Sequence, residues 1–93
     1  MEFNFAIKNN FLLENDIRLF FGEDENQIVN FEWLEENATI WEVLVKAGIF
    51  PSKGQARKDP RFKDGNIAEG VTDFVVGKKK TRIFIFKPFQ QTI

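Results

Sequence analysis

Two helix-capping pairs constrain this 93-residue chain more than any other feature of its sequence. Thr39 stands three positions before Glu42, and Ser52 stands three positions before Gln55. In such a capping box the hydroxyl accepts a hydrogen bond from the third helical amide, and each cap contributes about 1 kcal/mol. Gly48 lies between the two pairs, where a helix ends in a left-handed residue. The pattern predicts a short helix–turn–helix.

The residues that follow each cap support two helices that pack on each other. The first helix has one apolar face, formed by Ile40, Val43, Leu44 and Ala47. The second helix extends through Lys58 and is stopped by Pro60, which cannot continue it. Its small Ala56 is suited to packing against the first helix.

Strand signals precede the helices. Residues 3–7 alternate between apolar and polar side chains, as a half-buried strand does. Residues 17–21 and 27–31 are also strand-like, and the polar residues 22–26 between them favour a β-hairpin.

Strand signals also follow the helices. Residues 64–66 form a turn, and the β-branched and aromatic run 71–76 ends at Gly77. Residues 81–86 are apolar on both faces, which is typical of a central strand. The expected fold is therefore a single α+β domain over residues 1–93. It has an N-terminal β-hairpin, a short helix–turn–helix and C-terminal antiparallel strands.

The residue types that are missing narrow the possible functions. The chain has no cysteine and no histidine, which excludes disulfides, thiolate chemistry, the usual zinc sites and histidine-based catalysis. Acidic neighbours such as residues 24–25 and 35–36 are typical of a solvated face rather than a magnesium site. We therefore expect no enzyme activity, no catalytic or metal-binding residue and no cofactor. The absence of a long apolar run or signal peptide predicts a cytoplasmic protein without a membrane partner.

The charge is strongly divided along the chain. Residues 1–45 hold ten acidic and two basic residues, a net charge of −8, whereas residues 46–93 hold eleven basic and four acidic residues, a net charge of +7. Such a division predicts a basic face for a polyanion and an acidic face for another partner, unless the two halves pair with each other. We accordingly distinguish an acidic, β-rich part (residues 1–38) from a basic part (residues 39–93).

Two stretches of the basic part carry a family resemblance. Residues 44–58 contain an Ala-Gly turn between apolar residues and a Ser-Lys-x-x-Ala-Arg helix, and residues 74–80 end a strand in Gly-Lys-Lys-Lys. Together they resemble the S4-type RNA-binding domain, as it occurs at the C-terminus of bacterial tyrosyl-tRNA synthetases. The resemblance covers residues 41–87. It departs from the family at residues 58–66, where S4 domains continue the helix and then enter a central strand.

The resemblance implies that the basic part is an S4-like module that binds structured RNA, with tRNA or rRNA as the partner. Phosphate contacts of this kind recognise the shape of RNA more than its base sequence. The nucleic-acid-binding residues are expected on the second helix and around the lysine-rich turn: Ser52, Lys53, Arg57, Lys58, Lys78, Lys79, Lys80 and Arg82.

A second hypothesis starts from the acidic part. Its acids could mimic nucleic acid and block a host nucleic-acid-binding protein, as small phage inhibitors do, with a tryptophan as the interface anchor. The residues of this protein-interaction face are Glu23, Asp24, Glu25, Glu32, Trp33, Glu35 and Glu36.

Overall fold

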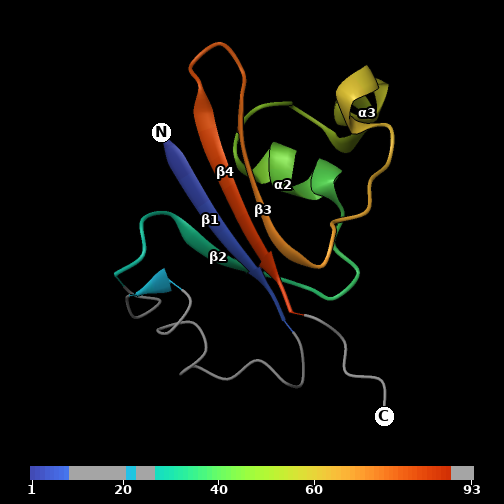
Figure 1. Ribbon diagram of the computed structural model, residues 1–93. Helices are drawn as coiled ribbons and strands as arrows, with labels where there is room; N and C mark the ends of the chain where they lie inside the picture. Colours follow the sequence, from blue (N-terminus) through green and yellow to red (C-terminus); the bar gives the residue numbers. More distant parts are fainter. Residues whose placement is uncertain (9–20, 23–26, 89–93) are drawn as a thin grey trace.

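A four-stranded mixed sheet carries two short helices on one face in the computed structural model, which describes residues 1–8, 21–22 and 27–88 (Figure 1). The strand order is β2-β1-β4-β3. The strands are β1 (Glu2–Ile7), β2 (Phe31–Leu34), β3 (Gly70–Val76) and β4 (Thr81–Lys87). The helices are α2 (Ile40–Lys46) and α3 (Lys53–Lys58), and the 3-10 helix η1 (Pro60–Phe62) follows α3.

Strand β4 is central, as its apolar character on both faces predicts. It pairs with β3 in an antiparallel hairpin that closes at Val76 opposite Thr81. On its other side it pairs in parallel with β1, with Ile85 opposite Phe5. Strand β1 in turn pairs in parallel with β2. The predicted C-terminal antiparallel strands are thus confirmed, and they share one sheet with the start of the chain.

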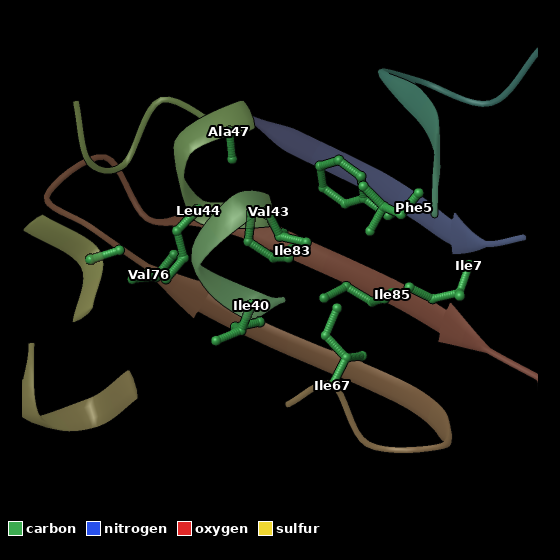
Figure 2. Packing of buried hydrophobic residues seen from close by; sticks show 12 residues of the cluster. Phe5, Ile7, Ile40, Val43, Leu44, Ala47, Ile67, Val76, Ile83 and Ile85 are labelled. Atoms are coloured by element: carbon green, nitrogen blue, oxygen red, sulfur yellow. The ribbon is translucent and has the colours of Figure 1, made fainter. Parts of the chain in front are cut away.

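The main core lies between α2 and one face of the sheet. Val43 and Leu44 of α2 are fully buried, as are Ile83 and Ile85 of β4. Figure 2 shows the α2 side chains pointing toward those of β1 and β4. Alternate residues of a strand point to opposite faces, so Ala6 belongs to a separate, smaller cluster on the other face.

The predicted caps are present at both helices. The Thr39 hydroxyl accepts from the Glu42 amide at 3.4 Å, and the Ser52 hydroxyl accepts from the Gln55 amide at 3.3 Å. Gly48 has a φ of 76°, in the left-handed region. Behind it, the Ile49 amide donates to the carbonyl of Leu44 at 2.9 Å, which closes α2 in a Schellman motif. Ala56 is fully buried in the main core, as expected for the contact between helices.

Trp41 ties α2 to the segment that follows α3. Its indole N–H donates to the carbonyl of Phe62 at 2.7 Å. The backbone of Gly65 is buried against the same indole, and the carbonyl of Gly65 accepts from the Ile40 amide at 2.8 Å. A Cβ at residue 65 would lie 2.6 Å from ring carbons of Trp41, so only glycine fits there.

The expected N-terminal β-hairpin needs correction. Residues 17–20 and 23–26 lie outside the described part of the chain, but residues 27–30 form turns instead of a strand. Asn30 has a φ of 47°, which no strand residue adopts, and its side-chain amide donates to the carbonyl of Glu2 at 2.8 Å. These contacts hold the turn against β1. The chain then enters β2 at Phe31, parallel to β1.

Residues 59–69 differ from the central strand that an S4 domain places after its basic helix. They form η1 and an irregular segment, and the next strand begins only at Gly70. Within this segment the Asp64 carboxylate accepts from the Asn66 amide at 2.9 Å, which confirms the predicted turn.

The close contact between Gly65 and the Trp41 ring can be tested by measuring stability. We expect Gly65→Ala to displace the Trp41 indole and to lower the free energy of unfolding by about 1–3 kcal/mol, as overpacking a core does. Gly54→Ala is the matched control, because the nearest atom to its new Cβ is the Ser52 hydroxyl oxygen at 3.8 Å. It should raise stability by about 0.5–1 kcal/mol, since it removes a glycine from a helix. Urea unfolding followed by tryptophan fluorescence measures the free energy of unfolding of both variants. If the two substitutions change it equally, the close contact between Gly65 and Trp41 is contradicted.

Candidate nucleic-acid interface

Helix α3 presents three cations to solvent. Lys53, Arg57 and Lys58 are all exposed, and none of them forms an ion pair with another described residue. The hydroxyl oxygen of Ser52 caps α3, as its capping pair predicts. The part of the predicted site on α3 therefore combines this cap with three cations that no described carboxylate neutralises.

Arg57 is held in place by an aromatic ring. Its guanidinium carbon lies 4.6 Å from the centre of the Trp41 ring, within the range of a cation–π interaction. Because Trp41 is itself fixed by its hydrogen bond to Phe62, the guanidinium has a defined position on the surface. The contact leaves the charge of Arg57 unneutralised.

The loop between β3 and β4 presents three more cations. Gly77 has a φ of 83° and Lys80 a φ of 52°, and the Lys80 amide donates to the carbonyl of Gly77 at 3.1 Å. This tight turn leaves Lys78, Lys79 and Lys80 exposed, again without ion pairs to described residues. Figure 1 shows the loop at the same end of the molecule as α3.

Arg82 differs from the other predicted cations, because it is engaged within the sheet. It donates to both carboxylate oxygens of Asp73, at 3.0 and 2.8 Å, and also to Glu2 at 3.4 Å. The hydrogen bond to Asp73 raises the pKa of Arg82, and the same bond lowers the pKa of Asp73. Arg82 thus has two carboxylate partners and is not a free cation of the basic end.

A groove of about 500 Å³ is lined by the β3–β4 loop and by the segments that precede and follow α3, whereas no residue of α3 itself lines it. One wall comes from the β3–β4 loop and includes Lys78 and Lys79. Phe50 and Asp59, which precede and follow α3 in the chain, also line the groove. Of the predicted nucleic-acid-binding residues, Lys78 and Lys79 line the groove, and those of α3 do not.

The groove also contains a cation that sequence reasoning missed. Arg61 lines the groove and binds Asp59 in a bidentate pair, at 3.1 and 2.8 Å. Asp59 also caps η1 by accepting from the Arg61 amide at 2.9 Å. These hydrogen bonds hold the pKa of Asp59 below its usual range. An Asp directly before Pro60 is a signal for such a capped turn.

The acidic face is partly neutralised where the structure describes it. Glu32 forms an ion pair with Lys46 at 2.8 Å, and this hydrogen bond raises the pKa of Lys46. Glu35 pairs with Lys8 at 3.3 Å, whereas Glu36 is exposed. Residues 23–25 lie outside the described part.

Trp33, the expected anchor of that face, is half-buried. Its ring lies 5.4 Å from that of Phe31 in an edge-to-face arrangement. It packs against the smaller cluster of Ala6 and Ile28, on the sheet face opposite the helices. The tryptophan therefore has a packing role in the fold.

The described residues were compared with the requirements of a metal site and of a membrane-spanning helix. They contain no group of three acidic residues arranged to hold a metal ion. Nor does either helix there have the length and apolar character needed to cross a bilayer.

Comparison with protein-family models, with curated proteins and with solved structures finds no match to this chain. The geometry of the site is therefore the basis for assigning a function.

The Asp73–Arg82 pair predicts a titration and a stability effect. We expect the Asp73 carboxylate to titrate below its ordinary pKa of 3.8, and Arg82→Gln to raise that pKa. Because the pKa of Asp73 is lower in the folded state, the ion pair stabilises the fold at pH values above the ordinary pKa of the carboxylate. This stabilisation is lost as the pH falls through the lowered pKa of the folded state. Carboxyl NMR titration measures the shift. Arg61→Gln is the control, which should move the pKa of Asp59 and leave that of Asp73 unchanged.

Proposed function

We propose that this chain is a non-enzymatic, S4-like nucleic-acid-binding module that binds structured RNA through its phosphates. One observation carries the proposal: α3 and the β3–β4 loop lie at one end of the molecule, and their six exposed cations form no ion pair with another described residue. Elsewhere, Lys8, Lys46 and Arg82 lie in ion pairs with carboxylates, whereas Lys63 and Lys87 do not pair with a described carboxylate. We call the six residues the basic end: Lys53, Arg57, Lys58, Lys78, Lys79 and Lys80.

The charge distribution favours a polyanionic partner over pairing between the two halves of the chain. If the halves neutralised each other, the cations of the basic end would have carboxylate partners. Only Lys46–Glu32 and Arg82–Glu2 join the two halves among the described residues. Exposed cations repel one another, so five lysines and one arginine on neighbouring elements are favourable mainly when an anion covers them.

Structured RNA fits this arrangement because the positive charges of the basic end lie on α3 and on the tight β3–β4 turn, which hold them in place. The lysines and Arg57 suit contacts with phosphate oxygens, which position a nucleic acid without reading its bases. A-form RNA is recognised largely in this way, by its backbone and its shape. The succession of helix–turn–helix and β3–β4 hairpin within residues 41–87 adds support for the S4-like comparison.

The acidic-mimic hypothesis has less support from the described residues. A mimic of nucleic acid needs uncompensated negative charge, whereas Glu32 and Glu35 each lie in an ion pair with a lysine. Trp33 is half-buried rather than presented to a partner. We therefore propose RNA as the partner.

Charge reversal at the basic end tests the proposal. Lys53→Glu, Lys58→Glu and Lys79→Glu should each weaken the binding of an RNA hairpin by a similar factor whatever its base sequence. Each should also reduce the slope of log affinity against log salt by about 1, because one phosphate contact and its released counterion are lost. Fluorescence anisotropy with labelled hairpins over a range of KCl concentrations gives both quantities.

The matched control is Lys8→Glu. It makes the same change in net charge, but Lys8 follows β1 at the end of the sheet away from the lysine loop. It should leave RNA binding nearly unchanged. If all four variants behave alike, or if the unaltered protein binds no RNA at low salt, the proposed function is wrong.

A further inference from the structure

The groove beside the β3–β4 loop is lined by apolar residues as well as by lysines. Its floor is apolar and includes Ala47, Ile49 and Phe50, whereas its lysine wall is cationic. Phosphate contacts alone need no apolar floor. At about 500 Å³, the groove is in the size range of small-molecule sites, which runs from about 300 to 1,000 Å³.

Phe50 offers an aromatic surface within this groove. Its ring is partly buried and stands edge-to-face with Phe62, with ring centres 6.5 Å apart and planes at 82°. In such a pair one ring points its edge at the face of the other, so at least one face of Phe50 is not covered by Phe62. Phe62 itself does not line the groove.

The two walls of the groove differ in charge. Lys78 and Lys79 carry unpaired positive charges, whereas Arg61 and Asp59 neutralise each other on the opposite wall. Arg61 uses Nε and Nη2 for Asp59, so its Nη1 is still available to donate a hydrogen bond. One wall therefore suits an anion, and the other suits a neutral polar edge.

We propose that the groove takes one unpaired nucleotide of the bound RNA, which makes it a subsite next to the duplex-binding surface. The phosphate of the nucleotide lies at Lys78 and Lys79, its base packs on Phe50 and Ile49, and the polar edge of the base faces Arg61. This inference rests on the proposed function, because the neighbouring duplex is held by the basic end. Unpaired bases in RNA are free to stack on protein rings in this way.

A nucleotide suits the groove better than an acidic peptide does. Each nucleotide joins one negative charge to a flat apolar ring with a polar edge, and the groove is lined by the cationic Lys78 and Lys79, by apolar residues and by the polar Arg61–Asp59 pair. An acidic peptide would match the lysines but would leave the apolar floor uncovered. The base–aromatic contact is also tolerant of sequence, because every base has a π-face.

The test compares two RNAs and two variants. The probes are a blunt RNA hairpin and the same hairpin with one unpaired 3′ or 5′ 2-aminopurine nucleotide. We expect the unpaired nucleotide to increase affinity about fivefold or more, which is the lower end of the measured stacking gain converted to a ratio. The fluorescence of 2-aminopurine should fall on binding as the base stacks.

Phe50→Leu should abolish the gain in affinity from the unpaired nucleotide and the quenching of 2-aminopurine. It should leave the affinity for the blunt hairpin unchanged. Phe62→Leu is the control, because it removes the same ring–ring contact from a residue that does not line the groove, although it also removes the ring that lies 5.3 Å from the Arg61 guanidinium carbon. It should retain the preference and the quenching. Thermal unfolding of both variants verifies that they are folded to a similar degree.

The experiment distinguishes a failure of the nucleotide subsite from a failure of the proposed function. If both RNAs bind equally well, or if Phe62→Leu loses the 2-aminopurine quenching as Phe50→Leu does, the nucleotide subsite is wrong and the proposed function stands. If neither RNA binds at low salt, the proposed function is wrong as well. If a polyglutamate peptide binds in a Phe50-dependent way and displaces the unpaired nucleotide, the groove is a peptide site and the inference is overturned.

Discussion

The parallel pairing of β1 with β4 is the contact on which the rest of the structure depends. It aligns Glu2 with Arg82 and Phe5 with Ile85, residues about eighty positions apart in the chain. Parallel strands cannot be joined by a tight turn, so everything between them must form a crossover that returns to the sheet. Here α2 supplies that return, with Val43 and Leu44 packed on the sheet. Without this pairing, β4 would be an edge strand, and the floor beneath α2 would lose Phe5 and Ile7.

The same pairing positions the proposed site. Because β4 starts beside the first residues of β1, the β3–β4 loop lies at one end of the sheet. The turn after α2 reaches the same end, where a Cβ on Gly77 would lie only 3.5 Å from Ile49. Gly48 and Gly77 both have positive φ values, so two tight turns meet at the groove. The groove is therefore a consequence of two left-handed turns brought together by one strand register.

The parts of the fold that sequence reasoning predicted correctly are those with local causes. Thr39 and Ser52 cap their own helices, Gly48 ends its own helix, and the apolar residues on both faces of residues 81–86 reflect the central position of one strand. Strand β2 was missed because Phe31–Leu34 is short and its pairing partner, β1, lies far away in sequence. Two acids that seemed free, Glu32 and Glu35, acquire lysine partners only in the folded chain.

The candidate site follows the same division between local and non-local causes. The six cations of the basic end could be found from sequence, because exposed lysines need no tertiary partner to remain exposed. The ion pair between Arg82 and Asp73 was not predicted, although the register of the β3–β4 hairpin indicates it. A four-residue turn at residues 77–80 pairs Val75 with Arg82, and this places Asp73 diagonally next to Arg82 on the same face. The groove could not be predicted from the sequence, because the segments that line it are brought together by the β1–β4 pairing.

The division of charge also explains how the basic end would be presented to RNA. The whole chain has a net charge of −1, so a polyanion gains almost nothing from its net charge at long range. Attraction begins only within about a Debye length, roughly 8 Å at physiological salt, where the local charge outweighs the total. At that distance Lys53, Lys58 and Lys79 attract phosphates, whereas an approach from the side of Glu36 meets repulsion. In the proposed complex, the polarity of the molecule would therefore select the orientation of binding, through repulsion as well as attraction.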